Sequence, residues 1–225
     1  AQTMVDIGKL AGKPVVAVIT SMAQPLGTHI GNALEVKDAI DVLAGRTQGD
    51  LLEISLLLGS HMLVLAEKAK TLPEARAMLE NALSSGAGLR KLAEMIAAQG
   101  GDPRVVEDLS LLPQAAVKRV MRAETAGYLS AMDTTALGMA AQRMGAGRAK
   151  KSDMLDYSVG YVLHVRLGDE VTEDTPLATL YARNEAEAEE AEKAIRKALT
   201  IAKEKPSVPP LWDAVVTAEG ITYSR

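Results

Sequence analysis

The chain has 225 residues, no cysteine and a formal net charge of −4 at pH 7. This length fits one large domain or two smaller ones, and the absence of cysteine excludes disulfides and thiol chemistry. It lacks the basic face that nucleic-acid binders use to neutralise phosphates, and it has no apolar stretch long enough to span a membrane. These features favour a soluble cytoplasmic protein that binds neither nucleic acid nor a membrane.

The first half of the chain is predicted to be mostly helical. Residues 2–12 predict a helix that ends at Gly12. Residues 14–20 form an uninterrupted apolar run, which is typical of a parallel strand buried on both faces. Apolar periodicity then predicts four helices, over residues 30–44, 50–70, 73–84 and 86–99. Thr71 is the expected N-cap of the third of these.

The early strand leads to an expectation about the rest of its sheet. No second strand of the same kind is found between Gly27 and Pro113. A lone buried strand cannot satisfy its backbone donors and acceptors. We therefore expect its partners to lie upstream of Ala1, which implies that the chain is a fragment.

The second half of the chain has a different character. Residues 102–113 are polar and contain proline, so we place a domain boundary there and expect domains over 1–112 and 113–225. Beyond the boundary, the pattern predicts a hairpin of 117–122 with 127–132 and a helix from Asp133 to about Met144. It then predicts strands over 161–167 and 177–181, a charged helix over 184–203 and a last strand over 212–218.

Together these elements predict the fold class. The first domain is expected to be an α/β fragment with one buried strand plus helices. The second is expected to be an α+β C-terminal domain.

Three segments resemble the thymidine and pyrimidine-nucleoside phosphorylases in their order and spacing. The first runs from Ala17 to Gly27 and on into Gly31-Asn32-Ala33-Leu34-Glu35-Val36, its most specific part. The second is Gly127 to Arg148, which ends in Met144-Gly145-Ala146-Gly147-Arg148. The third contains Asp156-Tyr157-Ser158-Val159-Gly160, Arg166-Leu167-Gly168-Asp169 and Pro176-Leu177. The resemblance covers essentially the whole chain.

The resemblance implies a fold and an activity. In that family a helical lobe and an α/β lobe enclose the active site, and an α+β domain follows. The implied reaction is phosphorolysis of a pyrimidine nucleoside, thymidine or uridine, to the free base and a pentose 1-phosphate. The implied enzyme is a cytoplasmic homodimer without an organic cofactor.

The same resemblance places the family's reaction machinery outside this chain. Its phosphate-binding glycine-rich segments, active-site histidine and base-binding arginine, serine and lysine lie before the point that matches Ala1. No catalytic or substrate-binding residue is therefore assigned here. The isolated chain is expected to be inactive.

One functional element of the family does fall within the chain. Some bacterial members bind a metal ion such as potassium through backbone carbonyls and an acidic side chain. The matching positions here are Leu26, His29 and Asp38. His29 would contribute only its carbonyl oxygen. Asp38 stands where the family commonly has glutamate, so its carboxylate has a shorter reach.

Other residues favour structural roles. His29, His61 and His164 are scattered without a catalytic partner at suitable spacing. The Gly145-Ala146-Gly147-Arg148 segment closes a predicted helix, which favours a C-cap over a phosphate-binding loop.

Two other functions are alternatives. Residues 163–181 also resemble the hairpin of lipoyl and biotinyl carrier domains, which need a lysine at a turn. Here Lys150-Lys151 lies in a polar loop instead. The other alternative is an assembly module without catalysis. The apolar faces of residues 30–44 and 50–70 could then pair with another subunit or with a missing lobe.

Overall fold

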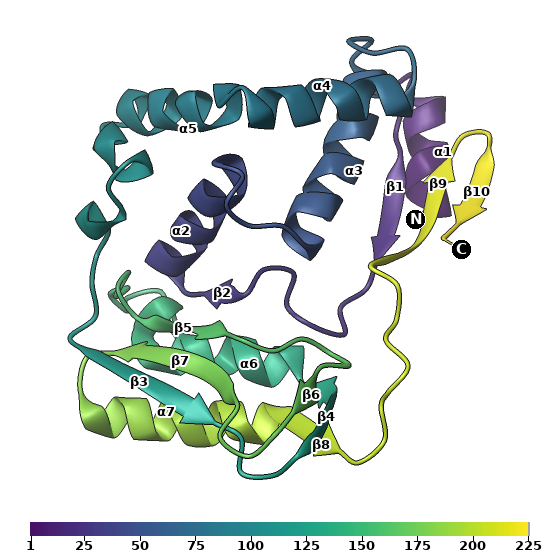
Figure 1. The fold of residues 1–225 in the computed structure, drawn as a ribbon. Coiled ribbons are helices and arrows are strands. Elements are labelled where there is room, and N and C mark those ends of the chain that lie inside the picture. The colour runs from purple at the N-terminus through teal and green to yellow at the C-terminus, as the bar shows by residue number, and fades with distance from the viewer. Residues whose placement is uncertain (225) are drawn as a thin grey trace. The chain divides into compact units, whose positions relative to one another are not determined.

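The structure is a computed structural model that describes residues 1–224. Its contacts divide the chain into two compact units (Figure 1). Unit 1 comprises Ala1–Ser21, Val42–Lys91 and the residues from Pro209 onward, and unit 2 comprises Met22–Asp41 and Leu92–Val208. Each unit is built from separate stretches of sequence, so neither coincides with a domain that ends at residue 112. The boundary between 1–112 and 113–225 stays a prediction.

Unit 1 contains a three-stranded antiparallel sheet in the order β1-β9-β10. Its strands are β1 (Ala17–Thr20), β9 (Trp212–Thr217) and β10 (Gly220–Tyr223). The prediction of a parallel strand buried on both faces is wrong. β1 is an edge strand that pairs antiparallel with β9, and its last two residues are exposed. The C-terminal segment supplies a partner, so the expectation of missing upstream strands loses its physical ground.

Helices complete unit 1. The first helix, α1 (Gln2–Leu10), packs on β9 and β1 with Val5 and Gly8 buried. A Cβ on Gly8 would overlap the Val15 side chain, so glycine permits this close approach. Two further helices, α3 (Asp50–Leu65) and α4 (Leu72–Ser84), pack against each other. The predicted cap is confirmed, because the Thr71 side chain accepts a hydrogen bond from the Glu74 amide.

Unit 2 contains two small sheets. The four-stranded sheet has the order β2-β5-β7-β3, and the three-stranded sheet has the order β6-β4-β8. All their pairings are antiparallel. The strands of the first are β2 (His29–Ile30), β5 (Gly160–Leu163), β7 (Pro176–Ala182) and β3 (Val117–Arg122). Those of the second are β6 (Glu170–Val171), β4 (Gly127–Met132) and β8 (Leu199–Ala202).

The predicted hairpin of residues 117–122 with 127–132 is wrong, because β3 and β4 belong to different sheets. The connection between them is fixed by another segment. The Ala123 amide donates to the Thr175 carbonyl at 2.9 Å, and the Asp174 amide donates to the Ala123 carbonyl at 3.2 Å. The chain therefore crosses from one sheet to the other where the local sequence suggests a tight turn.

Two helices of unit 2 pack against each other, α6 (Thr134–Ala141) and α7 (Glu185–Ala198). The predicted Asp133 cap is confirmed by its bond from the Ala136 amide, and α6 continues as a π-helical turn, η3 (Gln142–Ala146). The helix predicted over 184–203 is too long. Residues 199–202 form β8, which pairs with β4 because the β-branched Thr200 and Ile201 suit an extended strand.

The remaining elements connect these parts. Helix α2 (Asn32–Leu43) follows β2, and α5 (Ala87–Ala98) follows α4. The predicted linker contains two short 3-10 helices, η1 (Pro103–Val106) and η2 (Leu109–Leu111). Each begins at an aspartate cap, Asp102 and Asp108.

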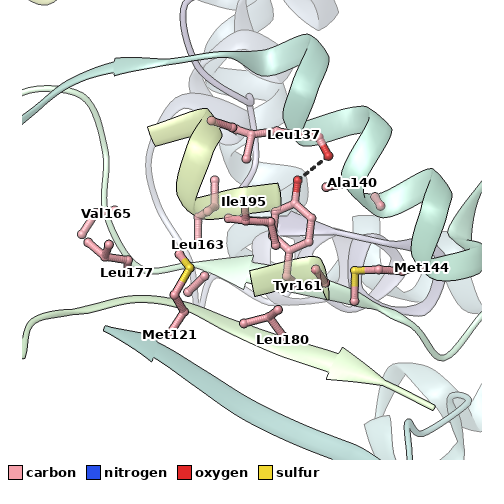
Figure 2. Packing of buried hydrophobic residues seen from close by; sticks show 14 of the residues in the cluster. Met121, Leu137, Ala140, Met144, Tyr161, Leu163, Val165, Leu177, Leu180 and Ile195 are labelled. Carbon is pink, nitrogen blue, oxygen red and sulfur yellow. Dashed lines mark hydrogen bonds between the residues drawn. The ribbon is translucent and has the colours of Figure 1, made fainter. Parts of the chain in front are cut away.

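The core of unit 2 is mostly aliphatic, and the chain contains no phenylalanine. Figure 2 shows side chains from α6, α7 and the strands meeting around Tyr161. The Tyr161 hydroxyl donates a hydrogen bond to the Leu137 carbonyl at 2.8 Å, which satisfies the one polar atom of this side chain. Burial raises the pKa of Tyr161.

The architecture is mixed α/β, which confirms the broad fold class. The finer description of one buried strand plus helices is wrong for the first part of the chain. Within residues 1–224, no helix combines the length and the apolar character needed to cross a membrane.

Candidate functional site

The loop before β2 carries the first predicted ion ligand, Leu26, and is tied to the segment that follows β5. One nitrogen of the Arg166 guanidinium, Nη1, donates to the Pro25 carbonyl at 2.6 Å. A second nitrogen, Nη2, lies 3.5 Å from the Leu26 carbonyl oxygen. The Leu167 amide donates to the Gln24 side chain at 2.9 Å. These contacts fix the loop, and sequence spacing alone gave no sign of them.

Two glycines bring β2 and β5 into close approach after this loop. Gly31 has φ +137° and Gly160 has φ +148°. A Cβ on Gly160 would overlap the Ile30 carbonyl oxygen, and one on Gly31 would overlap the Val159 carbonyl oxygen. Both positions therefore need glycine, for backbone conformation and for space.

Helix α2 begins within the segment Gly31 to Val36, which carries the most specific resemblance. Contacts from this segment fix the start of the helix. The Asn32 side chain donates to the Ala146 carbonyl at 2.8 Å, and the Ala33 amide donates to the Tyr157 carbonyl at 3.0 Å. The predicted helix closure at Gly145 is present, since this residue has φ +107°. The three resembling segments thus meet within unit 2, and they place α2 with its acidic residues beside β2.

The structure brings His29 and Asp38 together. The His29 Nδ1 lies 3.4 Å from the Asp38 Oδ1, and the Asp38 residue is only 3% exposed. The pKa of His29 is lowered, chiefly by burial, with Lys37 acting in the same direction and Asp38 opposing it. His29 is therefore mostly neutral at pH 7 and does not neutralise the aspartate.

The Lys37 ammonium group has other partners. It lies 3.0 Å from the Asp41 carboxylate and 3.4 Å from the His29 Nε2. No lysine or arginine of the described residues forms an ion pair with Asp38. A buried carboxylate without a positive partner is costly, because burial removes its hydration. Asp38 is therefore a candidate ligand for a cation.

The donor set suits an alkali cation, which prefers hard oxygen ligands. Asp38 has a carboxylate, and Leu26 has a carbonyl oxygen that lies 3.5 Å from Arg166 Nη2. Within residues 1–224, no group of three or more acidic or histidine side chains is arranged so that it could hold a metal ion. An ion here would depend on backbone carbonyls, and the assignment of Leu26 and His29 as its ligands stays a prediction.

The other histidines have ordinary surroundings. His164 Nε2 lies 2.7 Å from the Thr179 hydroxyl oxygen, and burial lowers the pKa of His164. His61 lies on α3, and burial lowers its pKa as well.

The lysine pair invoked for a carrier is not at the tip of a hairpin. Lys150 and Lys151 are exposed, and they lie in a turn that the Asp153 carboxylate closes by accepting the Lys150 amide at 3.0 Å.

Comparison with known proteins first defines the class. Residues 1–89 match the family model described as "Glycosyl transferase family, a/b domain". Residues 128–202 match the model described as "Pyrimidine nucleoside phosphorylase C-terminal domain". The match to the a/b domain thus comes first along the chain and the match to the C-terminal domain second.

Individual relatives narrow the class further. The chain is 49% identical over 185 residues to the pyrimidine-nucleoside phosphorylases of Geobacillus stearothermophilus and of Bacillus subtilis (strain 168), which covers 82% of this chain and 43% of each relative. It is 42% identical over 217 residues to that of Staphylococcus aureus (strain USA300), which covers 96% of this chain and 50% of the relative. The chain belongs to the pyrimidine-nucleoside phosphorylase family, and it spans about half the length of the curated relatives that it matches.

Proposed function

We propose that the whole protein is a pyrimidine-nucleoside phosphorylase, a pentosyltransferase that converts thymidine or uridine and phosphate to the free base and a pentose 1-phosphate. The observation that carries the proposal is the identity of 42–49% to proteins of that name, with both family models matched in order. In this reaction phosphate attacks C1′ of the sugar as the base leaves, through an oxocarbenium-like state. Exclusion of water favours phosphorolysis over hydrolysis.

This chain would contribute positioning and no catalytic group. The loop held by Arg166 and the close approach of Gly31 and Gly160 fix the path of the backbone into α2. The residues that the resemblance assigns to phosphate, sugar and base lie before the point that matches Ala1. Catalysis by the whole protein would therefore use groups outside residues 1–225.

Phosphate dependence tests this proposal. The whole protein is incubated with thymidine or uridine, with and without phosphate, and base and sugar phosphate are quantified by chromatography. We expect base and pentose 1-phosphate in equal amounts and only with phosphate present. Base release that is independent of phosphate would reject phosphorolysis and point to a hydrolase. No turnover of either nucleoside would reject the substrate assignment.

We also propose a potassium site formed by the carbonyl oxygens of Leu26 and His29 and the carboxylate of Asp38. Its support is the buried carboxylate beside a neutral imidazole. When bound, the ion would supply the positive charge that Asp38 lacks. Through the ion, the Asp38 side chain would then link α2 to the loop before β2.

A thermal melt in potassium chloride against choline chloride at equal ionic strength tests the site. We expect a potassium-specific rise in Tm that Asp38→Asn removes. Asp41→Asn is the matched control, because Asp41 lies on the same helix and pairs with Lys37. Equal melting in both salts, or a rise that survives in Asp38→Asn, would count against the site.

The proposal extends to assembly and location: a homodimer in the cytoplasm. Light scattering coupled to size-exclusion chromatography measures the first, and a monomeric mass for the whole protein would reject it. The carrier alternative is not favoured, because the matched models are those of a transferase and a phosphorylase. The assembly-module alternative is not favoured for the same reason.

A further inference from the structure

The strand β10 is an edge strand of the sheet in unit 1. Among the strands of residues 1–224 it pairs with β9 alone, at one end of the order β1-β9-β10 (Figure 1). All of its residues are exposed. An edge strand presents backbone N–H and C=O groups that have no strand partner, and these groups are a template for pairing with another chain.

The register of β10 on β9 shows which backbone groups point outward. The Ser224 amide donates to the Asp213 carbonyl at 2.9 Å, and the two residues are opposite each other when the register is continued by one position. Hydrogen-bonded and non-hydrogen-bonded pairs alternate along an antiparallel ladder. Thr222 therefore points its backbone groups at β9, whereas Ile221 and Tyr223 point theirs away from it.

This edge lacks the features that usually protect an edge strand. Proteins block such edges with lysine, other charges, proline or a bulge. Residues 220–223 contain no charged residue and no proline, and their register with β9 has no irregularity. Ile221 is 47% exposed and Tyr223 is 69% exposed, and both side chains lie on one face because the residues are two positions apart. The edge thus combines outward backbone groups with apolar side chains.

The pattern of outward groups is self-complementary. When two copies of β10 are aligned antiparallel about Thr222, Ile221 of each copy is opposite Tyr223 of the other. These are the residues with outward groups, so each pair exchanges both of its N–H···O=C bonds. The same alignment places an isoleucine beside a tyrosine on one face, and such β-branched and aromatic cross-strand pairs stabilise a sheet.

We propose that β10 is a self-association strand, through which two copies of this chain pair antiparallel with a two-fold axis at Thr222. The two sheets then continue as one, in the order β1-β9-β10-β10-β9-β1. A second copy fits this edge better than a foreign peptide, because a two-fold contact pairs every outward group with its own counterpart and closes after two copies. The inference goes beyond phosphorolysis and does not rest on it, nor on the homodimer that the family resemblance implies.

The contact is short, so the association is expected to be weak. A pair of strands of four residues buries far less than the roughly 1,200–2,000 Å² of a stable interface. We expect a Kd between about 10 μM and 1 mM. Sedimentation equilibrium of the 225-residue chain measures this, with a mass that rises from 23.8 kDa towards twice that value as the concentration increases. A mass that stays at 23.8 kDa up to about 1 mM would overturn the inference.

Charge substitutions at Thr222 test the two-fold axis. Thr222 is exposed, so Thr222→Lys is expected to leave the fold intact, but it places two like charges directly opposite each other. We expect it to weaken association about two- to fivefold at low salt, and Thr222→Glu to do the same. An equimolar mixture of the two variants is expected to associate more tightly than either alone, because opposite charges then meet at the axis.

The matched control is Ala218→Lys, which adds the same charge in the exposed turn before β10. It is expected to leave association unchanged. Circular dichroism confirms that each variant keeps its fold. Equal weakening by Ala218→Lys and Thr222→Lys, or a mixture that associates no better than its components, would also overturn the inference.

A single cysteine locates the contact directly, because the chain contains none. At the axis, Thr222 forms a non-hydrogen-bonded pair with its own copy, in which the Cα atoms lie about 4.5 Å apart and within reach of a disulfide. With oxidised glutathione, Thr222→Cys is expected to give a disulfide-linked dimer on a non-reducing gel. Thr20→Cys, an exposed position on the opposite edge strand β1, is the comparison and is expected to remain monomeric. Equal or faster crosslinking at Thr20→Cys would reject β10 as the contact.

Discussion

The close approach of Gly31 and Gly160 makes a strong prediction about stability. Gly160→Ala places a methyl group against the Ile30 carbonyl oxygen and within 2.9 Å of the Gly31 Cα. It also forces an L side chain to adopt φ +148°. Backbone strain of this kind costs roughly 1–3 kcal/mol, and overpacking costs about the same. We therefore expect the free energy of unfolding to fall by about 2–6 kcal/mol.

The control variant is expected to change stability in the opposite direction. Gly138 lies inside α6, and apart from its chain neighbours and the backbone of its own helix no atom lies within 4 Å of its ideal Cβ. Gly138→Ala should stabilise unit 2 by about 0.5–1 kcal/mol, because alanine loses less backbone entropy in a helix. The pair separates a local clash from a general effect of added methyl groups.

Urea denaturation followed by far-UV circular dichroism measures both effects. The sole tryptophan, Trp212, lies on β9 in unit 1, so its fluorescence reports that unit separately. For Gly160→Ala we expect the circular-dichroism midpoint to fall more than the fluorescence midpoint. A change below about 0.5 kcal/mol for Gly160→Ala, within the usual range for neutral substitutions, would refute the reasoning about this contact.

Two further predictions concern polar groups of unit 2. Tyr161→Phe removes the hydrogen bond to the Leu137 carbonyl and should lower stability by about 0.5–1.5 kcal/mol in urea denaturation, and an unchanged midpoint would contradict that role. The pKa of Asp156 is lowered, chiefly by the Ser158 hydroxyl, so its contribution to stability is present above the unfolded pKa of about 3.9 and is lost as the pH falls through the lower folded pKa. In urea midpoints, Asp156→Asn should therefore cost most at pH 7, and the cost should shrink as the pH falls below about 3.9. A cost that does not change with pH would contradict a charge-dependent contact.

Local signals in the sequence predicted much of the helical structure. The caps at Thr71 and Asp133 and the closure at Gly145 depend on neighbouring residues, and all three are present. These features can be predicted because the unpaired backbone groups at a helix end form hydrogen bonds with residues only a few positions away.

Strand pairing could not be predicted in the same way. The apolar run before Thr20 indicates a strand but contains no information on its partner, which is β9, about 200 residues further along the chain. The segment after Arg122 has the residues of a tight turn, yet Ala123 bonds to Asp174 and Thr175 instead. The energy of a strand depends on its neighbours, and these are non-local.

The candidate ion site could be predicted only in part from the sequence. The helical position of Asp38 follows from periodicity, and the family resemblance pointed to Leu26 and His29. The burial of Asp38 beside a neutral His29 required the structure. The contact of Arg166 with the loop joins positions about 140 residues apart, and no spacing rule predicts it.

We propose that this chain is part of a pyrimidine-nucleoside phosphorylase and supplies none of the groups that react. The most direct test is an assay of the purified 225-residue chain with thymidine and phosphate, beside the whole protein at equal concentration. We predict thymine and pentose 1-phosphate from the whole protein and no thymine above the blank from the chain alone. Phosphate-dependent release of thymine by the 225-residue chain would contradict the claim.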